Sequence, residues 1–237
     1  MSRPERAIFV GTSGFSYPSW RGAFYPEDLP ARAMLSFYAQ AFSTVEINNT
    51  FYRMPSATLL TGWVSQVPDG FRFALKAPQR ITHHLRLRDA ADPTTRFCTL
   101  ATELGPKRGP LLFQLPPNLR ADHPRLDAFL AALPSGIEAS VEFRHASWLT
   151  EETFSLLRAR GVALCVADTE EQSTPAVATA PFGYLRLRRE DYSAAALDAW
   201  AEQVRDASGW ERVYVYFKHD DAGRAAALAN AFLARLR

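Results

Sequence analysis

Hydrophobic residues occur along the chain in short runs, each followed by a polar loop and then by a longer amphipathic stretch. The short runs are rich in β-branched and aromatic side chains, which is typical of β-strands. The expected strands are residues 8–10, 44–47, 71–76, 111–115, 140–143, 162–167, 184–187 and 213–217. The amphipathic stretches carry apolar residues at helical spacing. The expected helices are residues 31–42, 57–66, 95–104, 124–133, 151–160, 194–207 and 221–236.

Strands that alternate with helices indicate βαβ units and a parallel sheet. Eight units in 237 residues leave about 30 residues for each, the short end of the range for a (β/α)8 barrel. The alternative is an open doubly wound sheet, but the segment GTSGFS at 11–16 lacks the GxGxxG spacing of its phosphate loop. We therefore predict an α/β fold, a single-domain (β/α)8 TIM barrel over residues 1–237. Its sixth connection, residues 169–181, is expected to be short or irregular.

Alternation within the strands places polar side chains on the inner face of the predicted barrel. Where apolar residues such as Val45 and Ile47 face the helices, the residues between them face inward. The inward set is Glu46, Asn48, Lys76, Gln114, Glu142, Arg144, Arg186, Arg188 and Lys218. Most lie near the C-terminal ends of their strands, where barrels of this kind have their active sites.

With Asp168 after the sixth strand, this mouth holds five positive and three negative side chains, an excess of +2. Such a cluster predicts an anion-binding site that also contains acid/base groups. Glu142 is the expected catalyst, supported by Glu46 or Asp168, with Arg144 holding one carboxylate ionised and apolar walls keeping the other protonated. The alternative is structural ion pairing, of Glu142 with an arginine and of Glu46 with Lys76.

The remaining candidates are assigned to substrate binding. Lys76 would be a Schiff-base amine only if its pKa were depressed, and we expect its acidic neighbours to keep it protonated as an anion contact. The polar and aromatic candidates are Asn48, Asn49 and Gln114 for hydroxyl groups, Ser13 for an anion, Tyr52 and Trp148 for stacking, and His84 as a proton carrier or phosphate donor. For Ser13 and His84 the alternative is an ordinary loop role, and for the aromatic residues it is packing on the rim of the barrel.

Metal and nucleophile chemistry have little support in the sequence. The histidines form neither HxH nor HExxH spacing, so no cofactor is expected. A single divalent ion on Glu46, Glu142 and Asp168 is the alternative, which the surrounding positive charge disfavours. No His/Asp relay is evident for Ser13, and Cys165 is expected in the core.

Composition narrows the choice of function. Hydrophobic residues make up 47% of the chain and charged residues 22%, which is typical of a soluble globular protein. A net charge of +2 gives no bulk electrostatic argument for nucleic acid or a membrane surface, and no apolar stretch approaches the length of a membrane span. Two distant cysteines, Cys98 and Cys165, fit a reducing compartment, so we expect a cytoplasmic protein.

Six ordered motifs resemble those of the YecE-like domain-of-unknown-function family. They are GTSGFSYPSWRGAFYP at 11–26, FSTVEINNTFYRMP at 42–55, FRFALKAPQRITHH at 71–84, GPLLFQLPP at 109–117, VEFRHASW at 141–148 and VYVYFKHDD at 213–221. The resemblance implies a (β/α)8 barrel and supplies no activity. Many members carry R-x-H-G where this chain has residues 186–189, and two asparagines where it has Lys218 and His219. Both departures raise the positive charge.

These observations predict an enzyme that acts on a small phosphorylated or otherwise anionic molecule, such as a sugar phosphate or a nucleotide derivative. A hydrolase, a lyase or an isomerase would fit the acid/base groups. One alternative is a protein that binds nucleic acid or cleaves phosphodiesters with the same basic mouth. Another is a non-catalytic binding scaffold, because one barrel fold serves many functions.

Overall fold

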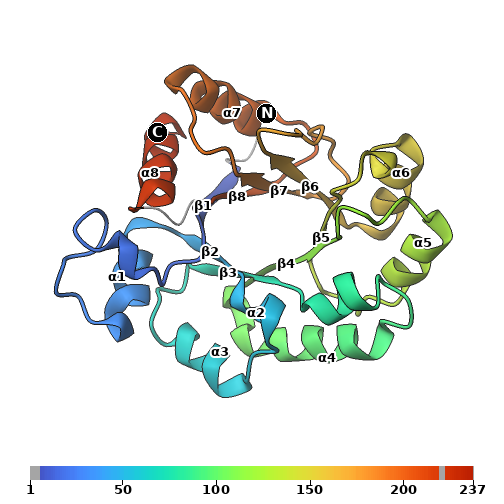
Figure 1. Cartoon of the computed structure of the whole chain (residues 1–237), viewed down its shortest axis with the longest axis horizontal. Coiled ribbons are helices and arrows are strands. Elements are labelled where there is room, and N and C mark those ends of the chain that lie inside the picture. The colour runs from blue at the N-terminus through green and yellow to red at the C-terminus, as the bar shows by residue number, and fades with distance from the viewer. Residues whose placement is uncertain (1–5, 219–221, 237) are drawn as a thin grey trace.

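Eight parallel strands close into a barrel, in which each strand pairs with the next along the chain and the last pairs with the first (Figure 1). The computed structural model describes residues 6–218 and 222–236. The strands are β1 (Ala7–Ser13), β2 (Thr44–Ile47), β3 (Arg72–Lys76), β4 (Arg108–Gln114), β5 (Ala139–Glu142), β6 (Ala163–Asp168), β7 (Phe182–Leu187) and β8 (Arg212–Phe217). The predicted (β/α)8 barrel is confirmed, and the open sheet is excluded by the pairing of β1 with β8.

Helices form an outer ring around this barrel (Figure 1). They are α1 (Met34–Ala41), α2 (Asn49–Tyr52), α3 (Ala57–Val64), α4 (Ala91–Ala101), α5 (His123–Ala131), α6 (Glu151–Arg160), α7 (Ala194–Asp206) and α8 (Arg224–Leu236). All but α2 match expected helices, and 169–181 is the loop that the sequence predicts. The expected start of the last helix, residue 221, lies outside the described residues, as does His219.

The end signals of α6 show why its bounds could be predicted to the residue. The Thr150 hydroxyl accepts a hydrogen bond from the backbone N–H of Thr153, which satisfies one free donor of the first turn. Gly161 ends the helix with a φ of 62°, a left-handed conformation that favours glycine.

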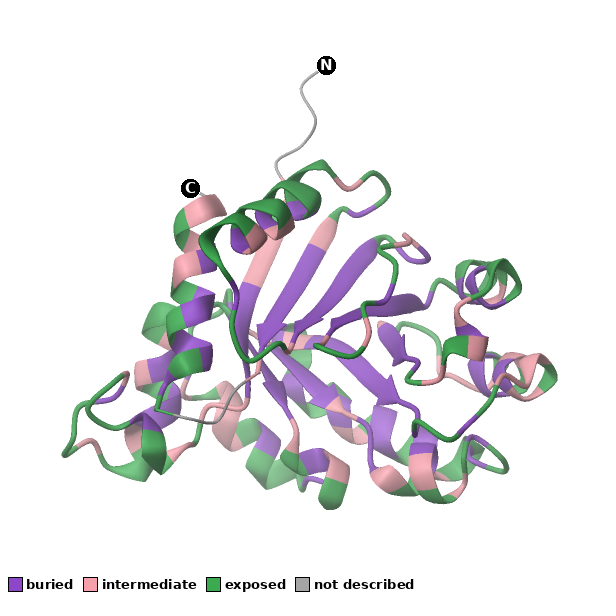
Figure 2. Ribbon diagram, turned by 45° about the horizontal axis from the view of Figure 1, so that its top comes forward, coloured by how far each residue is buried: buried purple, intermediate pink, exposed green. Residues whose placement is uncertain are grey.

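The barrel divides its apolar side chains between two layers, as the alternation within each strand predicts. Residues such as Val45, Phe73 and Leu75 belong to the large core between the strands and the helices. A smaller cluster fills the barrel itself and includes Ala74, Leu112, Cys165, Tyr184 and Tyr216. The strands are buried along nearly all of their length, whereas the helices expose one face (Figure 2). The inner polar residues therefore lie above a packed floor, at the C-terminal end of the barrel.

Candidate functional site

Arg186 of β7 lies inside the barrel between two carboxylates from other strands. Its side chain is 2% exposed, and one guanidinium nitrogen is 2.8 Å from Oε1 of Glu46 on β2. The other terminal nitrogen donates to Oε2 of Glu142 on β5. Because β2, β5 and β7 occupy different parts of the ring, this bridge crosses the interior of the barrel. Of the two ion pairs in the structural alternative, that of Glu142 with an arginine is present, whereas Glu46 pairs with the same arginine and not with Lys76.

Neutral donors complete the hydrogen bonding of both carboxylates. The Nε2 of Gln114 donates to Glu142 at 2.9 Å. The donors to Glu46 are the hydroxyls of Ser13 and Tyr184, both at 2.7 Å, and the Nδ2 of Asn48 at 3.2 Å. Ser13, Asn48 and Gln114 thus serve the carboxylates, although the sequence suggested them for substrate. Tyr184 was not among the predicted site residues, although its inward position follows from the same alternation.

Both glutamates are ionised because of this arrangement. Burial alone would raise the pKa of Glu46, but the charge of Arg186 and the hydrogen bonds from Tyr184 and Ser13 hold the pKa at about 2. Burial also acts to raise the pKa of Glu142, and the charges of Arg186 and Arg188 outweigh it, so that this pKa is lowered too. The expectation that apolar walls keep one carboxyl protonated is therefore wrong. Neither group is a proton donor near neutral pH.

Two further arginines lie above this buried bridge. Arg188 follows β7 with its Nη1 3.6 Å from Oε1 of Glu142, and its buried Nε has no hydrogen-bond partner among the described residues. Arg144 follows β5 and is exposed. A hollow of about 310 Å³ is lined by Glu142, Arg144 and Arg188, together with residues of the β6–β7 loop. Lys218, half-buried directly after β8, donates its backbone N–H to the carbonyl of Leu187 at 3.2 Å.

Lys76 ends β3 and is half-buried, with Nζ 4.0 Å from the centre of the Phe51 ring. Its ammonium group makes no hydrogen bond or ion pair within residues 6–218 and 222–236. Burial and the charge of Arg186 lower its pKa to about 8, against the opposite effect of Glu46 and Glu142. The acidic neighbours do not set the pKa of Lys76, because burial and the charge of Arg186 outweigh them, but a group with a pKa of about 8 is still mostly protonated at pH 7.

The one-turn helix α2 places Phe51 over this lysine. The Thr50 hydroxyl is within 3.1 Å of the Ile47 carbonyl and 2.7 Å of the Lys76 carbonyl, which ties α2 to the ends of β2 and β3. His83 packs its ring edge-on against Phe51, with the ring centres 4.9 Å apart. Burial is the main cause that lowers the pKa of His83, followed by the charges of Lys76 and Arg144.

His83 was missed because no periodicity distinguishes it from His84. The two residues end a π-helical turn, Arg80–His84, which a pattern of α-helices and strands does not predict. His83 is partly buried beside Phe51, and His84 is exposed on the rim.

Asp168 and Trp148 do not face the interior of the barrel. Asp168 has the outward alternation of Val166, and its carboxylate accepts hydrogen bonds from Arg189 at 2.8 Å and from the hydroxyl of Tyr192 at 3.0 Å. Trp148 is 0% exposed and donates its indole N–H to the carbonyl of Leu119 at 2.8 Å. Trp148 is thus the rim-packing residue of the alternative interpretation, and Asp168 is not part of the inner charge cluster.

The two α2 candidates are at the surface. Tyr52 is 73% exposed at the end of α2, and Asn49 is exposed at its beginning. Asn49 borders a separate hollow of about 640 Å³ between the β1 and β2 loops. Their place on α2, next to the half-buried Phe51, leaves both side chains accessible to a ligand from outside the barrel.

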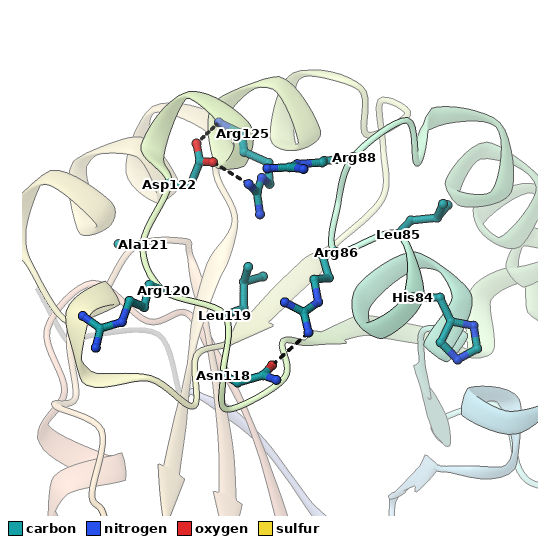
Figure 3. A pocket seen from close by; sticks show the side chains of 10 residues that line it. All are labelled: His84, Leu85, Arg86, Arg88, Asn118, Leu119, Arg120, Ala121, Asp122 and Arg125. Carbon is teal, nitrogen blue, oxygen red and sulfur yellow. Dashed lines mark hydrogen bonds and ion pairs between the residues drawn. The ribbon is translucent and has the colours of Figure 1, made fainter.

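A second basic hollow, of about 500 Å³, lies between the loops that follow β3 and β4 (Figure 3). Arg86 and Arg88 reach it from the first loop, and Arg120 and Arg125 from the second. Its other lining residues are His84, Leu85, Asn118, Leu119, Ala121 and Asp122. Arg125 pairs with Asp122 at 2.7 Å, so one of the four guanidinium charges is neutralised within the hollow.

The backbone that carries Arg86 and Arg88 is strained. Arg86, Leu87 and Asp89 have φ values of 50°, 67° and 47°, in the left-handed region that side chains disfavour. Strain of this kind persists only where the surrounding structure holds the loop in place.

Two kinds of feature are absent from the described ranges. No three His, Cys, Asp or Glu side chains come together there as a group that could hold a metal ion. No helix in those ranges is long and apolar enough to cross a membrane.

Comparisons with known proteins agree with the fold. A family model described as "Protein of unknown function DUF72" matches residues 9–237. The chain is 32% identical to the UPF0759 protein YecE of Escherichia coli (strain K12) over 168 residues, which cover 68% of this chain and 59% of YecE. It is 28% identical to the UPF0759 protein YunF of Bacillus subtilis (strain 168) over 184 residues, which cover 73% of this chain and 64% of YunF. Each match thus spans less than two thirds of the relative's length.

A solved structure extends the likeness over the whole barrel. A DUF72 family protein from Thermotoga maritima superposes with a TM-score of 0.85 at 29% sequence identity. The superposition covers 97% of this chain and 99% of that protein.

Proposed function

Because the chain belongs to the DUF72 family, whose function is unknown, we propose a function from the chemistry of its barrel mouth. The protein is an enzyme that binds a small phosphorylated or otherwise anionic molecule, such as a sugar phosphate or a nucleotide derivative. The observation that carries this proposal is the placement of Arg144 and Arg188 on a hollow whose buried floor already has its own counter-ions.

Charge arithmetic supports an anionic ligand. The floor contains Arg186 and two glutamates, which together leave one negative charge. Lys76, Arg144 and Arg188 add three positive charges, so these six side chains carry +2. Two exposed glutamates of the β6–β7 loop, Glu170 and Glu171, also line the hollow and lie outside this count. Arg144 makes no ion pair with any residue that the structure describes, and the contact of Arg188 with Glu142 is long, at 3.6 Å. A phosphate or carboxylate would supply the missing partner through charge-assisted hydrogen bonds.

The roles follow from position. Arg144, Arg188 and Lys218 bind the anion, and Lys76 contacts the substrate beside them. Glu142 lines the hollow as a carboxylate, which suits it as a base or as an acceptor for a substrate hydroxyl. Glu46 holds Arg186 in place from below. Tyr52, Asn49 and His84 are left as outer contacts for a larger substrate.

A thermal-shift screen tests the proposal with sugar phosphates and nucleotides. A ligand that binds only the folded state raises the melting temperature. We expect such a rise for the wild type, its loss in Arg144→Ala and Arg188→Ala, and its retention in Arg96→Ala, which removes an exposed arginine of α4. The proposal fails if none of these anions shifts the wild type, or if the shift survives both mouth substitutions.

The arginine hollow of Figure 3 favours a second candidate, a ligand with several phosphates such as a short oligonucleotide. The side chains of Arg88 and Arg120 have no hydrogen-bond or ion-pair partner among the described residues, and the hollow is lined by the imidazole of His84 but by no Phe, Tyr or Trp side chain. Fluorescence anisotropy with a labelled oligonucleotide would then give an affinity that falls steeply with salt. Arg88→Ala and Arg120→Ala would weaken it, and Arg96→Ala would not.

A further inference from the structure

Lys76 differs from the other basic residues of the mouth in its surroundings. Its Nζ lies 4.0 Å from the centre of the Phe51 ring, and no carboxylate is within ion-pair distance of it among the described residues. The two carboxylates whose charges act on Lys76, of Glu46 and Glu142, are both bound to Arg186. The face of the Phe51 ring would also hold an ammonium ion, so the ring is not what favours the neutral amine. Partial burial, the lack of an acceptor for Nζ and the neighbouring charges of Arg186 and Arg188 are the features that favour a neutral, nucleophilic lysine.

The other lysines provide a comparison within the chain, which contains three. Lys107 is nearly buried and donates to the carbonyls of Val64 at 3.0 Å and Val67 at 2.7 Å, with Asp69 at 3.4 Å. Its ammonium is thus held by three acceptors. Lys76 has no such acceptor, and its pKa is lowered to about 8, mainly by burial and by Arg186.

We propose that Lys76 is a nucleophilic amine that forms a Schiff base with an aldehyde or ketone group of the substrate. The inference rests on the proposed function for the anionic part of that substrate, which Arg144 and Arg188 would bind. It makes the substrate class more specific, an anionic carbonyl compound such as a ketose or aldose phosphate.

The chemistry balances with groups that lie around the Phe51 ring. The neutral Nζ adds to the carbonyl carbon, a C–N bond forms, and the π electrons of the C=O bond move to oxygen. His83 accepts a proton from nitrogen and returns one to oxygen, which gives a carbinolamine. Loss of that hydroxyl as water then breaks the C–O bond and forms the C=N bond. The net reaction is amine plus carbonyl to imine plus water, and no oxidant or reductant is consumed.

Reductive trapping of the full chain tests this assignment. The protein is incubated at pH 8 with glycolaldehyde, or with dihydroxyacetone phosphate, in the presence of cyanoborohydride, and the modified peptides are mapped by mass spectrometry. A lysine with a pKa near 8 is half neutral at this pH, whereas an ordinary lysine is almost fully charged. We expect Lys76 to be labelled at least about tenfold faster than Lys107 or Lys218. Lys76→Arg should abolish the fast phase, and Arg96→Ala, on the outer surface of α4, should preserve it.

The two probes separate this inference from the proposed function. Selective labelling of Lys76 by both probes, with labelling by dihydroxyacetone phosphate slowed in Arg144→Ala, supports both. Selective labelling by glycolaldehyde without any effect of Arg144→Ala on the phosphate probe supports the amine and contradicts the anion site. Equal labelling of the three lysines, or the absence of label on Lys76, overturns the inference. This holds whether or not dihydroxyacetone phosphate binds at the mouth. Circular dichroism of Lys76→Arg confirms that a lost label does not reflect unfolding.

Discussion

Arg186 is the buried counter-ion of two carboxylates, which share its single guanidinium. The carboxylate of Glu46 accepts hydrogen bonds from Ser13, Tyr184 and Arg186, and an amide at this position would turn its NH2 group toward some of these buried donors and leave them unsatisfied. Glu46 is 0% exposed, so Glu46→Gln removes one of two counter-ions without changing the shape of the side chain. We expect this substitution to lower the free energy of unfolding by about 3 kcal/mol in urea denaturation at pH 7.

A surface pair provides the control for that measurement. Glu151 on α6 pairs with Arg158 in solvent, where ion pairs contribute little to stability. Glu151→Gln should therefore leave the urea midpoint unchanged within error. Equal effects of Glu46→Gln and Glu151→Gln would show that the buried bridge does not stabilise the fold.

Lowering the pH should remove the stabilisation that the ionised Glu46 gives to the fold. The pKa of Glu46 is about 2 in the folded state against an ordinary value of 4.5, so the group stabilises the fold fully above pH 4.5 and progressively less as the pH falls toward 2. The pKa of Glu142 is lowered in the same direction. In a pH series of urea denaturation, the difference between wild type and Glu46→Gln should narrow from pH 5 to pH 2. A difference that stays constant over this range would contradict the lowered pKa of Glu46.

At the level of the elements, β1 and β2 approach so closely that only glycine fits at one position. A Cβ on Gly11 would lie 1.9 Å from the carbonyl oxygen of Thr44 and 2.9 Å from the hydroxyl of Tyr38. That hydroxyl also accepts a hydrogen bond from the backbone N–H of Thr12 at 2.8 Å, so it has little freedom to move. We expect Gly11→Ala to lower the free energy of unfolding by about 2 kcal/mol, because the strands must separate to make room.

Gly62 is the matched control, because it lies in α3 with no atom within 4 Å of an added Cβ. Gly62→Ala should leave the protein equally stable or stabilise it by up to about 1 kcal/mol, since alanine is the better helix former. Thermal or urea denaturation of the two variants gives the comparison. A similar effect of both alanines would mean that the β1–β2 approach is not tight.

The elements also show which parts of the fold and site could be predicted. Alternation of apolar and polar residues placed Glu46, Glu142 and Arg186 inside the barrel, because one buried face leaves little freedom of register. It did not predict α2 or the π-turn Arg80–His84, which are single turns held by contacts such as that of Thr50 with the Lys76 carbonyl. Single turns have too few residues for a period, so Phe51 and His83 were missed. Asp168 was misplaced because it was assigned to the mouth by its position after the strand instead of by its alternation.

At the scale of the whole molecule, a net charge of only +2 contrasts with the concentration of cations at the C-terminal end of the barrel. The net charge of the chain could not reveal this uneven distribution, because the distribution depends on which strand ends meet in space. Partner choice within the buried cluster was equally inaccessible to sequence, because Lys76 and Arg186 both alternate inward. In the structure the partner of both glutamates is Arg186, whose planar guanidinium contacts the two carboxylates at once.

This asymmetry predicts how ligand binding should respond to salt. If local cations at the mouth bind the anion, screening by salt weakens the attraction although the chain as a whole is nearly neutral. For the sugar phosphate or nucleotide with the largest thermal shift, we expect the Kd to rise about three- to tenfold between 0.05 and 0.5 M NaCl. Arg144→Ala should weaken binding and flatten this dependence, because fewer charges remain to be screened. Arg96→Ala, on the outer surface of α4, should preserve both the affinity and the slope in isothermal titration calorimetry. A Kd that is independent of salt in the wild type would mean that the mouth recognises its ligand by neutral hydrogen bonds, and that its cations serve only the fold.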